Sequence, residues 1–150
     1  MRIGVAGPDF AEDAAVLALL REAFAFMDGR IDPPSSLDRM TVADVAAKRA
    51  VEVLLVAREG TRLAGCAFIS DRGDHGYLGK LAVAGDLRGR GIARRLVEAA
   101  AGSHPVLRLQ TRIELVENHA TFARLGFREI GRTAHPGFTR PTSITMERRP

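Results

Sequence analysis

The first third of the chain carries apolar residues at the spacing of amphipathic helices. Four of them fall on one helical face: Val16, Leu17, Leu20 and Phe24. This pattern predicts a helix that is capped by Asp9 and ends near Phe26, with acidic side chains in its first turn. A second helix is predicted from a cap at Ser35 or Ser36 to about Ala50.

From residue 51 onward the pattern is mostly that of β-strands, with apolar and β-branched runs between turn residues. Together with a short run near the start, it predicts strands at residues 2–6, 51–57, 62–70, 77–83, 106–113, 127–133 and 143–148. Further helices are predicted at residues 92–101 and 118–125, the second capped by Asn118. The order β-α-α-β-β-β-α-β-α-β-β is neither a βαβ alternation nor a repeat array. It predicts a single domain over residues 1–150, with a mixed sheet and helices on both faces.

Composition narrows the class of protein. A chain of 150 residues, 46% of them hydrophobic, can bury a substantial core. No apolar run approaches the roughly 20 residues needed to cross a bilayer, and the start of the chain lacks the apolar segment of a secretory signal. We therefore expect a cytoplasmic protein with no membrane partner. The single cysteine, Cys66, lies within an apolar run and is predicted to be a buried, inert thiol.

The charge is distributed unevenly along the chain. The formal net charge is +4, and the basic surplus lies in the last two thirds of the sequence. This surplus suits an anionic ligand. It is scattered rather than gathered in a block, and no ladder of aromatic residues accompanies it, so a nucleic-acid partner is not expected.

Residues 88–93, Arg-Gly-Arg-Gly-Ile-Ala, carry the clearest chemical signal. They connect a predicted strand to the start of a predicted amphipathic helix. Backbone N–H groups at a helix N-terminus lack intrahelical partners, and the helix dipole there favours negative charge. Glycines let the backbone approach a bulky ligand, and arginines add positive charge for phosphate oxygens. The turn is therefore predicted to bind a diphosphate.

Three phosphate-binding patterns can be compared with this turn. A P-loop would end in Gly-Lys-Ser or Gly-Lys-Thr, which is absent. A dinucleotide fingerprint would need a small residue in place of Arg94 and an acidic residue near Thr111. The third pattern, Arg/Gln-x-x-Gly-x-Gly/Ala, is satisfied by Arg88, Gly91 and Ala93.

With this pattern the chain resembles the GNAT acetyltransferase superfamily. The turn follows the strand that ends at Val83, opens a helix, and precedes a strand and a helix that close with Gly126-Phe127, as in that superfamily. The resemblance spans essentially the whole chain. It implies an α/β (α+β) fold with a mixed, mostly antiparallel central sheet of about six or seven strands. Helices would flank both faces, and strands four and five would splay apart.

The resemblance also implies acetyl-CoA as the acetyl donor, with its pantetheine arm in the gap between the splayed strands. Backbone groups of Leu81, Ala82 and Val83 would bond the pantetheine and polarise the thioester carbonyl. The diphosphate would lie on the turn, and two side chains of the following helix would complete the cofactor site. The residues of the turn and helix concerned are Arg88, Gly89, Arg90, Gly91, Ile92, Ala93, Asn118 and Phe122.

The catalytic half of the site departs from the family pattern. Where many relatives have a tyrosine that protonates the departing thiolate, this chain has Phe122, which has no proton to donate. The only tyrosine, Tyr77, is a candidate substitute, with a packing role as the alternative. Several relatives have an acidic base just before the equivalent of Leu81, where this chain has Lys80. Glu114 is therefore the candidate base, with a solvent-exposed carboxylate as the alternative reading.

The acceptor pocket is expected between the segment that follows the first helix and the late hairpin loop. In the first, Met27, Asp28 and Asp32 are the candidate substrate-binding residues, and an aspartate there could attract a cationic amine. The hairpin loop offers His135, Phe138 and Arg140. No His/Cys cluster has the spacing of metal ligands, so no metal is expected.

The sequence thus predicts an acetyl-CoA-dependent N-acetyltransferase that transfers acetyl directly to a primary amine of a small molecule or peptide. The alternative is a non-catalytic module of the same fold that senses acyl-CoA, which Phe122 and Lys80 keep open. Dimers are common among similar proteins, so a homodimer remains open, but nothing in the sequence marks an interface.

Overall fold

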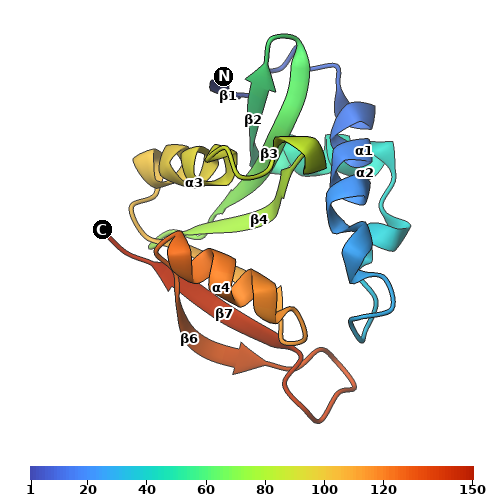
Figure 1. Ribbon diagram of the computed structural model, residues 1–150, viewed down its shortest axis with the longest axis vertical. Coiled ribbons are helices and arrows are strands. Elements are labelled where there is room, and N and C mark those ends of the chain that lie inside the picture. Colours follow the sequence, from blue (N-terminus) through green and yellow to red (C-terminus); the bar gives the residue numbers. More distant parts are fainter.

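A computed structural model describes residues 1–150, whose strands form one seven-stranded sheet (Figure 1). The strand order is β1-β2-β3-β4-β5-β7-β6, and every neighbouring pair is antiparallel except β4 and β5. The strands are β1 (Arg2–Val5), β2 (Val53–Glu59), β3 (Arg62–Asp71), β4 (Gly76–Val83), β5 (Leu107–Arg112), β6 (Arg128–Thr133) and β7 (Ser143–Arg148). The predicted mixed, mostly antiparallel sheet is confirmed.

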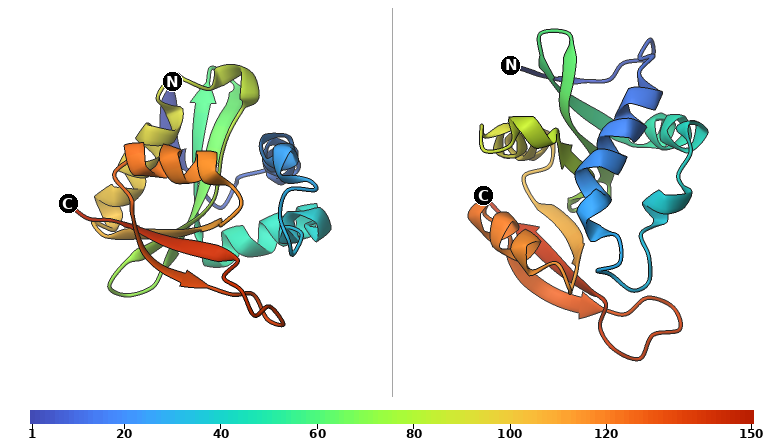
Figure 2. Two further views of the ribbon diagram at one scale, coloured as in Figure 1. Left: turned by 60° about the horizontal axis from the view of Figure 1, so that its bottom comes forward. Right: turned by 45° about the vertical axis from the view of Figure 1, so that its right-hand side comes forward.

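Helices cover both faces of this sheet (Figures 1 and 2). On one face lie α1 and α2, which pack against each other, and on the other lies α3, with α4 beside it over the β5–β7–β6 part. The bounds are α1 (Asp13–Phe24), α2 (Val42–Val51), α3 (Ile92–Ser103) and α4 (Val116–Arg124), with 3-10 turns η1 (Ala25–Met27), η2 (Ser36–Arg39) and η3 (Gly85–Leu87). No helix has the length and apolar character needed to span a membrane.

The core is one cluster of 30 buried apolar residues, drawn from both layers of helices and from the sheet between them. Phe68 and Leu96 are fully enclosed within it. Cys66 is buried in the same cluster, as predicted, and burial raises the pKa of its thiol to about 12. At neutral pH that thiol carries almost no thiolate, so it is chemically inert.

Three predicted helix caps are wrong. Residues 7–10 form a turn closed by the Phe10 N–H and the Gly7 carbonyl, so α1 begins only at Asp13 and Asp9 caps nothing. Ser35 caps only the short η2, because the chain is extended at Met40.

After that break Thr41 and Asp44 form a capping box that starts α2. The helix α4 begins at Val116, before Asn118, because Leu115 is buried and its carbonyl accepts bonds from the Asn118 and His119 amides. Tertiary burial, rather than the nearest capping residue, fixed these helix starts.

The junction between β4 and β5 is short. Only Gly76 with Leu107 and Tyr77 with Arg108 are paired, and the strands part beyond these positions. On its other side β4 stays paired with β3 up to Val83, although the register shifts between Cys66 and Phe68. At this bulge Lys80 has a φ of +51°. The predicted splay between strands four and five is confirmed.

Candidate functional site

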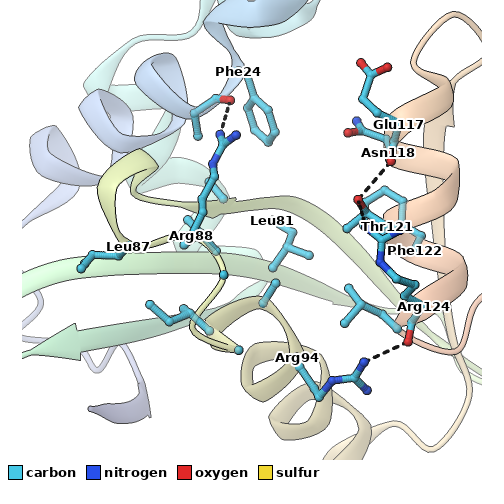
Figure 3. A pocket seen from close by; sticks show the side chains of 18 of the residues that line it. Phe24, Leu81, Leu87, Arg88, Arg94, Glu117, Asn118, Thr121, Phe122 and Arg124 are labelled. Atoms are coloured by element: carbon cyan, nitrogen blue, oxygen red, sulfur yellow. Dashed lines mark hydrogen bonds between the residues drawn. The ribbon is translucent and has the colours of Figure 1, made fainter.

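A pocket of about 870 Å³ lies where β4 has left β5 (Figure 3). The end of β4 and the segment 87–94 form one side, and the C-terminal end of α1 and the facing side of α4 form the others. Leu81 and Phe122 look into it from opposite sides (Figure 3). The pocket therefore opens between segments that are far apart in the sequence.

The segment from Arg88 to Arg94 presents backbone donors that the protein does not use. None of these seven consecutive N–H groups donates a hydrogen bond within the chain. Gly91, the N-cap of α3, is left-handed at φ +77° and supplies no side-chain cap, so the first turn of the helix remains uncapped. A row of free amides at a helix N-terminus is an anion site by its geometry and by the helix dipole.

Gly89 and Gly91 shape the surface in front of these amides. Both have left-handed φ, +79° and +77°, which residues with a Cβ rarely adopt. A Cβ at either position would meet no protein atom within 4 Å, so the space in front is open rather than filled by the fold. We call the segment from Arg88 to Arg94 the cradle, because its backbone amides face open space in which a ligand can bind.

The arginines of this region are engaged differently from one another. The Arg88 guanidinium donates to the Ala23 carbonyl at 3.2 Å and so ties the turn to the end of α1 (Figure 3). The Arg94 guanidinium donates to the Arg124 carbonyl at 2.9 Å and ties α3 to α4. Arg90 is exposed and does not line the pocket. The cradle therefore depends on backbone amides, while Arg88 holds it in place.

The free edge of β4 supplies backbone groups of a second kind. The Ala84 amide bonds to the Ala64 carbonyl in β3, so by the alternation of strands the groups of Val83 face away from β3, toward the gap. Leu81, Ala82 and Val83 all line the pocket. An extended ligand with amide groups could therefore pair with this edge.

Comparison with known proteins identifies this arrangement. Residues 50–129, more than half of the chain, match the sequence pattern of the acetyltransferase (GNAT) domain. The chain belongs to the GNAT acetyltransferase family. The match includes the β4 edge, the cradle and α4 up to its end.

Solved structures with the same fold cover almost the whole chain. A GNAT acetyltransferase from Streptococcus agalactiae aligns with a TM-score of 0.74 and 18% identity, over 99% of this chain and 95% of that one. The ribosomal-protein-S18-alanine N-acetyltransferase of Escherichia coli gives 0.71 and 20%, over 98% and 93%. PaiA N-acetyltransferase of Thermoplasma acidophilum, solved with coenzyme A, gives 0.76 and 13%, over 99% of both chains. A search of curated proteins gave no match.

The structure gathers nearly all the predicted cofactor-binding residues of this GNAT chain around one pocket. Arg90 alone lies outside its lining; the others line it, namely Leu81, Ala82, Val83, Arg88, Gly89, Gly91, Ile92, Ala93, Asn118 and Phe122. The ring of Phe122 packs edge-on against Phe127, with centroids 6.0 Å apart. This contact fixes the ring against the wall of the pocket.

Other pocket residues were not among the predicted cofactor-binding residues, although Arg30 lies in the segment that was expected to bind the acceptor. Arg30 and Glu117 form an ion pair of 2.6 Å between the segment after α1 and the start of α4, and both line the pocket. Phe24 and Phe26 approach it from the end of α1. These contacts join segments that are remote in sequence, so no local spacing could have revealed them.

The two candidate catalytic residues lie in different places, and neither lines the pocket. Tyr77 is near the closed end of the β4–β5 junction and does not line the pocket. Its ring lies under the Arg72 guanidinium at 4.8 Å, and burial raises the pKa of its hydroxyl. Glu114 lies in the turn between β5 and α4, where its Oε2 accepts the Asp32 amide at 3.0 Å. Its Oε1 is buried without a partner.

The candidate acceptor residues are divided. Met27 and Asp28 line a second pocket, of about 620 Å³, under the segment after α1. Asp32 lies elsewhere, with its carboxylate 3.3 Å from Arg140 in the β6–β7 loop. The two predicted acceptor segments therefore touch, and their contact involves Asp32.

Proposed function

We propose that this GNAT protein is an acetyl-CoA-dependent N-acetyltransferase that acetylates a primary amine of a small molecule or peptide directly. One observation carries the cofactor half of the proposal: seven consecutive backbone amides, Arg88 to Arg94, are free at the edge of an 870 Å³ pocket. A diphosphate needs several converging donors, and this segment offers them without any reorganisation.

In this proposal the same residues hold acetyl-CoA from its diphosphate to its thioester. The amides from Gly89 to Ala93 would bind its diphosphate, and the open space before Gly89 and Gly91 would admit the phosphate oxygens. The β4 edge from Leu81 to Val83 would bond the pantetheine amides as a neighbouring strand would. One N–H of the same edge would polarise the thioester carbonyl. Acetyl-CoA supplies the activated acetyl group.

Proton transfer falls to Glu114 in this proposal. The amine nitrogen attacks the acetyl carbonyl carbon, the carbon–sulfur bond breaks, and the amine proton passes to Glu114 directly or through water. Glu114 does not line the pocket and its Oε1 is buried, so the route through water is the one we propose. Phe122 lies on the pocket wall and cannot protonate the thiolate, so water supplies that proton. CoA thiolate is a good leaving group, and this loss is tolerable.

Calorimetry with acetyl-CoA tests the cofactor half, and the absence of binding would overturn the proposal. Release of free CoA thiol with a panel of primary amines tests the transfer. Binding without turnover on any amine would instead support the acyl-CoA-sensing module, which the absence of a proton donor at Phe122 would suit.

A further inference from the structure

Two cationic side chains on the α1–α2 side of the β4–β5 gap, Lys80 and Arg112, form no ion pair. Lys80 directly precedes the pocket residue Leu81, and its Nζ lies 3.4 Å from the Ser36 Oγ in η2. Arg112, at the end of β5, donates to the Pro33 carbonyl at 2.7 Å. Both cations therefore reach the same short segment, 33–36.

Neither cation forms an ion pair, since no carboxylate oxygen lies within 4.0 Å of either one. The other lysine differs. Lys48 pairs with Glu52 at 2.8 Å, so its charge is compensated. Lys80 is half-buried, and burial together with the charges of Lys48 and Arg112 lowers the pKa of its ammonium. A cation in such a place is unfavourable unless an anion joins it.

The backbone conformation at Lys80 is unfavourable as well as the burial of its charge. Its φ of +51° makes it the only non-glycine residue in the left-handed region. Glycine would adopt this conformation without strain. The bulge nevertheless carries a long cationic side chain and aims it at Ser36. Strained backbone conformations are common at ligand-binding sites, where they hold a side chain in the position that the ligand needs.

An acceptor for a positive charge lies close to these cations. Glu114 is two residues after Arg112, and the Asp32 amide that binds its Oε2 directly precedes the segment that Arg112 binds. The Glu114 Oε1 is buried and unpartnered. One short stretch, 32–36, thus joins the Glu114 carboxylate to the two cations. The charges of Glu114 and Asp32 favour the Arg112 cation, whereas only cations, Lys48 and Arg112, act on Lys80.

We propose that the acceptor amine of this enzyme also carries a carboxylate, as a compact amino acid does. Lys80, Arg112 and the Ser36 hydroxyl bind that carboxylate, and the negative charge of Glu114 attracts the amine. Arg112 ends β5 and Glu114 lies in the turn that follows, so both side chains come from one short segment, which suits an amine only a few bonds from its carboxylate. This inference rests on the proposed function, and it excludes polyamines as the preferred acceptors.

The chain itself offers a direct binding test, because it contains only two lysines, Lys48 and Lys80. Protein labelled with 13C-lysine gives two side-chain NMR signals, which Lys80→Met assigns. Amino acids and their primary amides are titrated with and without CoA. At least one amino acid should shift the Lys80 signal while its amide does not, and the Lys48 signal should stay in place. The inference is wrong if no amino acid moves the Lys80 signal, or if the amides move it equally.

Kinetics with the same pairs tests selectivity. The free carboxylate should raise kcat/KM over the amide by about 10- to 100-fold, the effect of a charge-assisted hydrogen bond. Lys80→Met should bring this ratio close to one, and Lys80→Arg should keep most of it. Lys48→Met removes a charge that is paired with Glu52 and acts on Lys80 only from a distance, so it should change the ratio far less than Lys80→Met does. Better turnover of amides or polyamines would refute the inference.

A loss of turnover in Lys80→Arg, equal for both members of a pair, would show that Lys80 moves a proton instead and would also refute it. The two proposals can fail separately. Failure to bind acetyl-CoA overturns the acetyltransferase, whereas the Lys80 titration without CoA judges the carboxylate site by itself.

Discussion

Substitution of Gly89 by alanine should weaken acetyl-CoA binding by the cradle much more than it lowers the stability of the fold. Gly89 has φ +79°, and a Cβ there would point into open space in front of the free amides. An L-residue in the left-handed region costs about 1–2 kcal/mol, part of which is offset by the reduced freedom of the unfolded chain. For a chain of 150 residues we expect a fall in Tm of about 2–4 °C.

The effect on acetyl-CoA should be larger than this. The new methyl group would occupy the space through which phosphate oxygens reach the amides, and would remove one charge-assisted hydrogen bond worth about 1.5–3 kcal/mol. Calorimetry should therefore show a Kd about 10- to 100-fold weaker for Gly89→Ala.

Gly73 provides a matched control for this measurement. It lies in the β3–β4 turn, outside the pocket, with φ +84° and no atom within 4 Å of a Cβ. Gly73→Ala should lower Tm by a similar amount and leave the Kd unchanged. The reasoning is refuted if Gly89→Ala binds acetyl-CoA like the natural protein, or if Gly73→Ala weakens binding equally.

Three further outcomes follow from individual side chains. Glu114→Gln should lower kcat by about 100-fold while calorimetry shows unchanged acetyl-CoA affinity, and an unchanged kcat would exclude Glu114 as the base. Cys66, with a thiol pKa of about 12, should resist alkylation at pH 8 until denaturant is added; rapid labelling of the folded protein would contradict its burial. Hydrogen bonds from Arg108 and Arg149 lower the pKa of Glu147, so its contribution to stability should be present at neutral pH and lost as acid protonates it. Glu147→Gln should flatten the fall of Tm below about pH 4.5, the ordinary range of a glutamate, and an unaltered profile would disprove this.

Local spacing was sufficient to find the cradle. The signals at Arg88, Gly91 and Ala93 lie within six residues of one another, and their meaning depends on a strand before them and a helix after them. The proposed binding of the diphosphate depends on backbone amides alone, so this prediction did not require knowledge of how side chains pack. The alternation of apolar residues likewise placed every strand to within two residues at each end.

Local spacing could not predict the contacts of the catalytic and acceptor residues. Arg88 holds the cradle in place through its bond to the Ala23 carbonyl. Because Ala23 is 65 residues away in sequence, only the structure could reveal this role. The partnership of Glu114 with the Asp32 amide spans 82 residues. Lys80 looked like the loss of a base, and only its left-handed backbone and its cationic neighbour Arg112 give it another meaning.

The short β4–β5 junction gives this sheet two unpaired strand edges inside the molecule. Exposed edges invite other chains to add a strand and aggregate, and proteins usually protect them at the surface. Here the free part of the β4 edge lines a pocket whose other walls come from α1 and α4, so the edge faces that pocket. A thin chain with amide groups can enter, and by completing the ladder it would join the two parts of the sheet. Acetyl-CoA would then act as a structural element as well as a substrate, and the thermal stability of the protein would rise with the concentration of acetyl-CoA.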